Sequence, residues 1–582
     1  MFRITRSAWL LLLTPASVFA AGANVYVRHD LVSDQAGLAD VTDPNLVNPW
    51  GVSFSATGPF WVSNTGKGNS TLYNGSGAIT PTVVTVPSAA AGKQGTPTGQ
   101  VFNAGTGFVL ANGSPARFIF STEDGTISAW NGGTLAAIMA DNSASGAVYY
   151  GLAIGTNAAG ATLLYAPNFT TGNIDVFDSK FAATKVSGGF ADPSLPAGYA
   201  PFNIWPLGGK LYVAYAKQGP LSCVAGAGSG QIAVFDFDGT LQKHLVSGGP
   251  LNAPWGLAIA PSTFGAFGGS LLVGNFGDGT INAFDLNTGA SQGTLQGADG
   301  NPIVFSGLWA LIVGNGGSGG DRNTLYITAG IGGLAHGLLS SLAPPAAILS
   351  VVNGASGASG AIAPGEVVVL NGINIGPSPL QSNAIPASGR VGSSLANVSV
   401  TFNYGSGGSI TAPILYCSAS QTSVIVPYGL AGFSTANVVV NYKGQITTQV
   451  PVALAAPGIF TGNFSGSGAA VALNADGTVN SATNAASAGS VITLFATGEG
   501  PEYPPGEDGV VNDRILRTPQ LPVSLTIGGQ TAHVLYAGTA IGAVQGVMQI
   551  EALIPTGLTG AAPVVLTVGS ATSQANVTIS VK

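Results

Sequence analysis

Charged side chains are scarce in this sequence. Asp, Glu, Lys and Arg together make up 7% of its 582 residues, against about 25% in an average globular protein. The few charges are mostly acidic and give a net charge of −7. Binding a nucleic acid takes clustered lysines and arginines that hold the phosphates, so this composition disfavours a nucleic-acid partner.

Residues that commonly carry chemistry are also few. The chain has 2 cysteines and 4 histidines. Its sequence contains no GxSxG elbow between a strand and a helix, no zinc-ligand spacing, no phosphate loop and no dinucleotide fingerprint. Cys223 and Cys417 fall in different predicted domains, which opposes a disulfide between them. We expect Cys417 to lie in a strand as a small buried side chain.

Long apolar runs are missing beyond the first residues. Residues 1–20 combine Arg3 and Arg6, an apolar run over 8–13 and a small-x-small cleavage site ending at Ala20, which together predict a signal peptide. No later stretch approaches the apolar length of a membrane span. We therefore predict an exported mature chain without a transmembrane segment, located outside the cell, on its surface or in the periplasm.

The sequence is instead rich in short strand patterns. In residues 252–289, Trp255-Gly256 opens an apolar run, Asp278-Gly279 marks a tight turn, and residues 281–284 alternate apolar and polar side chains. Three or four short antiparallel strands cannot close a core alone. Such a unit must therefore pack against copies of itself.

The copies are present. The last strand of the unit recurs as GTISAWN, GNIDVFD, GQIAVFD and GTINAFD. The aligned openings recur about every fifty residues, at Trp50, Thr98, Tyr150, Phe202, Trp255 and Ser306. This regular spacing predicts a six-bladed β-propeller over residues 23–342. RHDLVS at 28–33 matches KHLVS at 243–247, so we expect an N-terminal strand to complete the sixth blade and close the ring.

The stretch from LVSD to NPWG, at 31–51, resembles an uncharacterised family of exported bacterial propellers similar to the NHL and SMP-30-like folds. The resemblance implies the fold and no established chemistry. In SMP-30-like lactonases, carboxylate and Asn side chains at the blade openings hold calcium, whereas four of the six openings here are aromatic. A calcium-dependent lactonase-like hydrolase is therefore the alternative function for this half.

The second half contains a different duplication. PGEVVVLNGINIGP at 364–377 is echoed by AGSVITLFATGEGP at 488–501, and APILYC at 412–417 by AHVLYA at 532–537. We predict an all-β chain in which a linker at 343–350 leads to two Ig-like β-sandwiches, over 351–456 and 457–582. These motifs resemble a tandem Ig-like C-terminal domain family of exported bacterial proteins, from which Cys417-Ser418-Ala419 departs. The resemblance implies a presentation or adhesion module.

Two acidic loops are candidates for a hard cation such as Ca²⁺, although no cofactor is expected. The first holds Asp34, Asp40 and Asp43, and for both loops solvated carboxylates are the favoured explanation. The second lies in the last sandwich and holds Glu499, Glu502, Glu507, Asp508 and Asp513.

Taken together, these patterns favour an exported, non-catalytic binding or adhesion protein. Its partner is expected to be an extracellular polymer, a glycan or a protein. Because blade openings meet around the propeller axis, Trp50, Thr98, Tyr150, Phe202, Trp255 and Ser306 are the predicted ligand-binding ring. Packing between blades is the competing explanation for these aromatic residues. A self-assembling surface-layer or matrix subunit is the structural alternative.

Overall fold

The computed structural model describes residues 24–220, 222–377, 380–386, 389–511 and 515–582. Its regular structure is β-strand, as predicted, with 3₁₀ turns at η2 (Ser143–Ser145), η3 (Gly265–Phe267) and η4 (Tyr428–Leu430). Among the described residues, no helix has the length and apolar character needed to cross a membrane. The predicted signal peptide lies outside the described residues. The chain divides into two compact units, Ala21–Pro345 and Ala346–Lys582.

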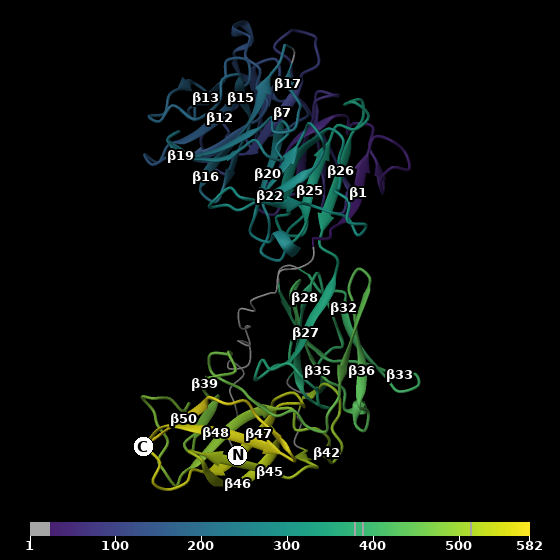
Figure 1. Cartoon of the computed structure of the whole chain (residues 1–582), viewed down its shortest axis with the longest axis vertical. Helices are drawn as coiled ribbons and strands as arrows, with labels where there is room; N and C mark the ends of the chain where they lie inside the picture. Colours follow the sequence, from purple (N-terminus) through teal and green to yellow (C-terminus); the bar gives the residue numbers. More distant parts are fainter. Residues whose placement is uncertain (1–23, 221, 378–379, 387–388, 512–514) are drawn as a thin grey trace. The chain divides into compact units, whose positions relative to one another are not determined.

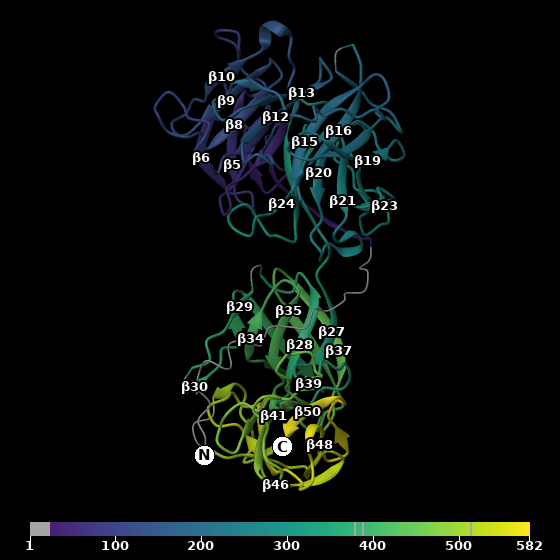
Figure 2. The ribbon, with the colours of Figure 1, turned by 90° about the vertical axis from the view of Figure 1, so that its left-hand side faces the viewer.

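Six sheets of four or five strands make up the first unit (Figures 1 and 2). Blade one contains β3 (Pro49–Ser53), β4 (Phe60–Asn64), β5 (Asn69–Tyr73) and β6 (Ile79–Thr85). Blade two contains β7 (Pro97–Phe102), β8 (Phe118–Thr122), β9 (Thr126–Trp130) and β10 (Ala137–Asp141). Blade three contains β11 (Ala153–Thr156), β12 (Thr162–Asn168), β13 (Asn173–Phe177) and β14 (Ala183–Thr184).

The other three blades follow the same order. Blade four contains β15 (Tyr199–Leu207), β16 (Lys210–Gln218), β18 (Gln231–Phe235) and β19 (Leu241–Ser247), and β17 (Cys223–Val224) pairs with β16. Blade five contains β20 (Pro254–Ile259), β21 (Leu271–Asn275), β22 (Ile281–Phe284) and β23 (Ser291–Thr294). Blade six contains β24 (Leu308–Val313), β25 (Leu325–Ala329), β26 (Leu338–Ala343) and β1 (Val27–Ser33), with β2 (Val41–Thr42) beside β1.

The blades form a closed ring. Their innermost strands contact one another in the order β3, β7, β11, β15, β20 and β24, and β24 contacts β3 again. The close approach depends on glycine, since a Cβ added to Gly99 in β7 would lie 2.3 Å from the backbone nitrogen of Leu152 in the next blade. The first unit is therefore a six-bladed β-propeller, as the repeat predicts.

The turn between β21 and β22 shows how the sequence builds a blade. The Asp278 carboxylate accepts hydrogen bonds from the Thr280 backbone N–H at 3.0 Å and from its hydroxyl at 2.6 Å. Gly279 has a φ of +73°, and an added Cβ would lie 2.3 Å from the Phe305 carbonyl. The Asp-Gly pair is thus required both by the turn and by the neighbouring loop.

The N-terminal strand closes the ring. β1 runs antiparallel to β26, with Val27 opposite Ala343 and Ser33 opposite Leu338. The prediction that this strand completes the sixth blade is confirmed. The pairing covers an edge of β26 that would otherwise expose unpaired backbone groups.

The second unit starts with a sandwich of two facing sheets. One sheet has the order β27 (Ala347–Asn353), β28 (Val367–Ile373), β35 (Gln421–Ile425), β34 (Ile414–Cys417) and β29 (Gln381–Ser382). The other has the order β31 (Ser394–Leu395), β32 (Val398–Tyr404), β36 (Thr435–Asn441) and β37 (Gln445–Pro451), and β33 (Gly408–Thr411) pairs with β32. Alternate side chains of both sheets, such as Val368, Val400 and Val438, share one buried core.

The last module is one continuous ten-stranded sheet. Its path is β38 (Gly458–Ile459), β41 (Val491–Thr497), β47 (Met548–Leu553), β46 (Gln530–Thr539), β45 (Val523–Ile527), β48 (Gly560–Val568), β50 (Val577–Val581) and β39 (Gly468–Ala469). Off this path, β40 (Ala472–Asn474) pairs with β41 and β49 (Ala571–Thr572) with β48. Ile459 near one end of the path and Ile579 near the other lie in the same buried core, so the sheet folds over into two layers.

The duplication seen in the sequence has the same pairing in both modules. The order β28-β35-β34 of the first module corresponds to β41-β47-β46 of the second. The linker, in contrast, is shorter than the predicted 343–350. β26 extends to Ala343 and β27 begins at Ala347. Pro344 and Pro345 interrupt the strand because proline has no N–H for a ladder, and the apolar pattern resumes directly after them.

Candidate functional site

The predicted ring residues meet around the propeller axis, but in its interior. The Trp50 ring lies 5.4 Å from Tyr150 and 6.2 Å from Trp255, and Tyr150 lies 5.3 Å from Phe202, between ring centroids. Their exposed fractions are 4% for Trp50, 5% for Tyr150, 0% for Phe202 and 1% for Trp255. The four predicted aromatic residues therefore do lie together, but their rings pack against one another and are not exposed to solvent.

Trp309 takes the sixth place in this ring. Its indole stacks on Trp50 at 3.5 Å and lies edge-on to Trp255 at 5.8 Å. Ser306, the predicted sixth member, lies before β24 and is exposed. The sequence alignment places the sixth opening three residues too early. Ser306-Gly307 has the same short pattern as the other openings, whereas Trp309-Ala310 takes their position in the structure.

Polar groups of the ring link different blades. Thr98, which is 0% exposed, donates its hydroxyl to the Tyr149 carbonyl at 2.7 Å. Trp255 donates its indole N–H to the Tyr150 carbonyl at 2.9 Å. The hydroxyl of Thr98 is thus already bonded within the protein. At this level of the axis the polar groups hold the blades together, which is a structural role.

The axis is hollow at its other end. A cavity of about 450 Å³ is lined by residues from the inner strands of all six blades. Each blade contributes the residue four places after its opening, and all six are half-buried: Phe54, Phe102, Ile154, Pro206, Ile259 and Val313. The position that lines the hollow is therefore set by the inner strand's register.

The lining of this axial hollow is apolar and uncharged. Phe54, Phe102 and Trp205 provide aromatic surface, and aliphatic side chains such as Leu311 provide most of the rest. Ser53 adds a buried hydroxyl, which has no hydrogen-bond partner among the described residues. Gln100 donates its amide to the Gly51 carbonyl at 3.0 Å, so its polar group is already used. The arrangement suits a small, uncharged and mostly apolar molecule.

Sequence reasoning missed the axial hollow. The signal was present, since five of its six repeated positions follow the aligned openings by four residues. The ligand site was predicted at the aromatic blade openings because exposed aromatic faces are typical of ligand sites. The residues at the openings and the residues four places later form two apolar layers along the axis. Which layer leaves a cavity depends on the side-chain sizes in all six blades together, so it can be seen only in the folded ring.

Apart from the axial hollow, Glu123 was also not singled out from the sequence. It follows β8, and its backbone N–H donates to the Thr96 carbonyl at 3.1 Å. Burial raises the pKa of Glu123 to about 7, and the neighbouring Asp124 carboxylate adds to the rise. The side chain therefore titrates close to neutral pH on the side of the propeller that carries the openings.

The three candidate metal ligands of the N-terminal loop are bound to three different partners. Asp34 accepts a hydrogen bond from the Gly337 N–H at 2.8 Å, and Asp40 pairs with His29 at 2.7 Å. Asp43 accepts the Tyr73 hydroxyl at 2.8 Å. The structure does not join them into one ligand set, and within the described ranges no group of three or more His, Cys, Asp or Glu side chains is arranged to hold a metal ion.

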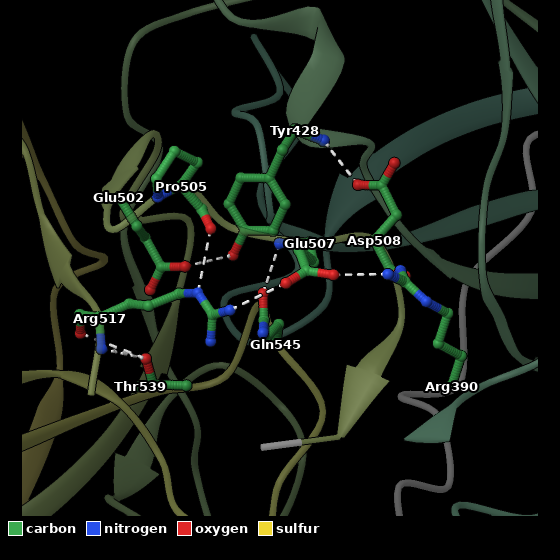
Figure 3. A network of polar contacts seen from close by, with 9 residues as sticks. All are labelled: Arg390, Tyr428, Glu502, Pro505, Glu507, Asp508, Arg517, Thr539 and Gln545. Atoms are coloured by element: carbon green, nitrogen blue, oxygen red, sulfur yellow. Dashed lines mark hydrogen bonds and ion pairs between the residues drawn. The ribbon is translucent and has the colours of Figure 1, made fainter. Parts of the chain in front are cut away.

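The second acidic loop lies against the first sandwich, where its carboxylates form a polar network (Figure 3). Tyr428 of η4 donates its hydroxyl to Glu502 at 3.0 Å and its backbone N–H to Asp508 at 2.8 Å. Glu507 accepts from Arg517 at 3.2 Å and from Arg390 of the first sandwich at 2.5 Å. Asp513 lies outside the described residues. The loop therefore joins the two sandwiches.

Two acids close to this network are buried deeply. Glu366 and Glu499 are each 1% exposed. Burial raises the pKa of Glu366 to about 8, although it accepts hydrogen bonds from Ala363 and Asn353. Burial and the nearby Glu502 raise the pKa of Glu499 well above its ordinary value. With a pKa of about 8, the Glu366 carboxyl holds a proton at neutral pH.

The cysteines are free thiols in separate units. Cys417 is 0% exposed and closes β34, so its predicted place as a buried strand residue is confirmed. Cys223 begins the short strand β17 and is half-buried.

The chain has sequence relatives among viral proteins. No family model matches it. Uncharacterized protein R648 of Acanthamoeba polyphaga mimivirus is 33% identical over 327 residues, covering 54% of this chain and 78% of the relative. Uncharacterized protein L690 of the same virus is also 33% identical over 327 residues, covering 54% and 84%.

Solved structures with similarity to this chain share little sequence with it. Virginiamycin B lyase from Staphylococcus aureus is 10% identical with a TM-score of 0.32, covering 55% of this chain and 99% of the enzyme. The PQQ-bound aldose sugar dehydrogenase from Streptomyces coelicolor is 13% identical with a TM-score of 0.33, covering 55% and 100%. The propeller assignment rests on the six sheets and their cyclic contacts, and the sequence matches show that the chain belongs to the family of the uncharacterised mimivirus proteins R648 and L690.

Proposed function

We propose that this protein is an exported, non-catalytic binding protein whose propeller holds a small, uncharged, mostly apolar ligand in the axial hollow. The observation that carries the proposal is the lining of that hollow by the same position from all six blades. Its volume of about 450 Å³ lies within the range of small-molecule sites.

The chemistry of the lining supports binding rather than catalysis. The lining residues carry aromatic and aliphatic surface together with neutral hydroxyl and amide groups. Acid–base or nucleophilic catalysis needs a titratable or activated group beside the bound molecule, and the lining offers the unpartnered Ser53 hydroxyl as a hydrogen-bonding anchor without a base beside it. Apolar burial would supply the affinity and Ser53 the orientation.

Binding of the neutral dye Nile red to the purified mature protein tests the proposal. Ile154→Lys places a charge at the half-buried wall of the hollow, and we expect it to weaken dye binding at least tenfold. The matched control is Ile138→Lys in β10, an isoleucine that is 37% exposed on an outer strand. Equal weakening by both substitutions would contradict the proposed site.

Catalysis is tested on the same preparation. Hydrolysis of simple lactones that stops on addition of a chelator would support the lactonase alternative instead. Ligand exchange without turnover is the result expected of a binding protein.

A further inference from the structure

A polar groove lies on the outer face of the first sandwich, away from its core. It has a volume of about 510 Å³ and is built from β32, β33, β36 and β37. Its ten lining residues are all uncharged. A groove that is polar without being charged selects for a ligand rich in neutral hydrogen-bonding groups.

The floor of the polar groove is a row of neutral side chains across neighbouring strands. Asn403 of β32 lies opposite Asn437 of β36, and Asn437 lies opposite Gln449 of β37. Ser409 of β33 extends the row on the other side of Asn403. Residues directly opposite on one face of a sheet have neighbouring side chains, so the three amides stand side by side.

These amides are open to a ligand. Asn437 and Gln449 are exposed and Asn403 is half-buried. Among the described residues, their side chains make no hydrogen bond within the protein. Each amide can both donate and accept, which matches the sugar hydroxyl, a group that also does both. A row of three can therefore bind hydroxyls along a chain of sugar units.

The Tyr404 side chain lies on the opposite face of β32 from Asn403, where it packs against the core of the first sandwich. Tyr404 packs against Phe433 with ring centroids 4.7 Å apart and planes tilted by 58°. Gly408 follows in the same hairpin, where an added Cβ would lie 2.5 Å from the Tyr404 ring. The glycine lets the ring lie close against the hairpin, and Phe433 fixes its orientation. The ring therefore belongs to the core side of the sheet, and the row of amides is the ligand-facing surface of the groove.

We infer that this polar groove binds a neutral polysaccharide, with the amides of Asn403, Asn437 and Gln449 holding its hydroxyls. The site is separate from the axial hollow and does not depend on the function proposed for the propeller. An exported protein with such a site would attach to a neutral glycan matrix through its first sandwich.

Affinity electrophoresis of the full mature chain tests this inference. The gels contain soluble β-glucan, arabinoxylan or galactomannan as neutral probes, and alginate as a charged probe. We expect retention by at least one neutral polysaccharide, and at least tenfold weaker retention for Asn437→Ala/Gln449→Ala. No retention by any neutral probe, or retention by alginate alone, overturns the inference.

A matched control is available on the same two strands. Asn441 and Gln445 are also an exposed cross-strand pair of amides, at the other end of β36 and β37. The variant Asn441→Ala/Gln445→Ala should be retained like the unmodified protein. Equal losses in the two double variants would show that the polar groove is not the site. Because all four substituted residues are exposed, a thermal melt should be unchanged in both variants.

Nile red binding should stay unchanged in every variant of the polar groove, so failure of this site and failure of the axial hollow are distinguishable.

Discussion

The hydroxyl of Tyr428 lies 3.0 Å from a carboxylate oxygen of Glu502 and donates a hydrogen bond to it across the junction of the two sandwiches. The Tyr428 ring is enclosed on two sides, since a Cβ added to Gly365 would lie 2.6 Å from the ring and one added to Gly506 would lie 2.4 Å from it. The two glycines come from the two different modules. The Tyr428 side chain of the first sandwich is therefore enclosed between its own module and the second module.

Tyr428→Phe should lower the free energy of unfolding of the C-terminal unit by about 1–3 kcal/mol, because it removes a partly buried hydrogen bond and leaves the buried Glu502 carboxyl with one partner fewer. Urea unfolding of the full chain, followed by far-UV circular dichroism, measures the change. Tyr503→Phe is the control, since Tyr503 is 71% exposed and should change stability very little. Equal effects of the two substitutions would show that the hydroxyl contributes nothing specific.

The stability of the C-terminal unit should fall as pH rises. Glu366 has its pKa raised from 4.5 to about 8 by burial. The folded state therefore binds more protons than the unfolded state between these values, so the stabilisation is complete below pH 4.5 and is lost as pH rises through 8. Melting temperatures from pH 4 to 9 should decline over this window, and Glu366→Gln should flatten the decline. A profile of the same slope in the variant would contradict the assignment.

The propeller should show a weaker dependence of the same sign. Burial raises the pKa of Glu123 from 4.5 to about 7, so its contribution is lost as pH rises between these values. Glu123→Gln should reduce this dependence in the melting transition of the propeller while leaving that of the C-terminal unit unchanged. A reduction in the wrong transition would contradict the placement of this effect.

Replacing Trp50 and Trp255 together by Ala should destabilise the propeller strongly. Both side chains are buried at the axis, and each large-to-small substitution costs about 3–5 kcal/mol. Differential scanning calorimetry should show a lower and broader propeller transition. Unchanged stability with lost glycan retention would instead support these residues as the ligand-binding ring that the sequence predicts.

The close approach of neighbouring blades is tested by glycine. Gly99→Ala places a Cβ 2.3 Å from the Leu152 backbone nitrogen, so inner strands must move apart, and we expect a loss of about 1–3 kcal/mol. Gly132→Ala is the control, because its added Cβ meets nothing within 4 Å. Urea midpoints compare the two. A tolerated Gly99→Ala would mean that the blades are packed less tightly than the structure indicates.

The fold followed from local signals that repeat. Asp278-Gly279 and its equivalents mark turns because of the backbone conformations these residues favour. The openings recur at nearly equal spacing. The sheets and the closing strand could therefore be predicted. The exact sixth opening could not, because Ser306-Gly307 and Trp309-Ala310 satisfy the same short pattern. Only the stacking of Trp309 on Trp50 decides between them.

The sites were harder to predict because they depend on distant residues. Trp50 and Trp255 have the side chains of a ligand platform, and neighbouring blades cover them. Asn403, Asn437 and Gln449 are ordinary strand residues until the register of β32, β36 and β37 aligns them. Burial and cross-strand register are properties of the folded sheets, which no local pattern of these residues contains.

The closing strand also decides how the propeller bears a mechanical load. β26 lies between β25 and β1, both antiparallel to it, and the chain leaves β26 for the second unit after Ala343. If the C-terminal unit is fixed to a matrix and the propeller is dragged by flow, the tension enters the propeller through the end of β26. The hydrogen bonds of two ladders must then break before this strand is released. The sixth blade would therefore withstand a pulling force that could peel away a strand paired on one side.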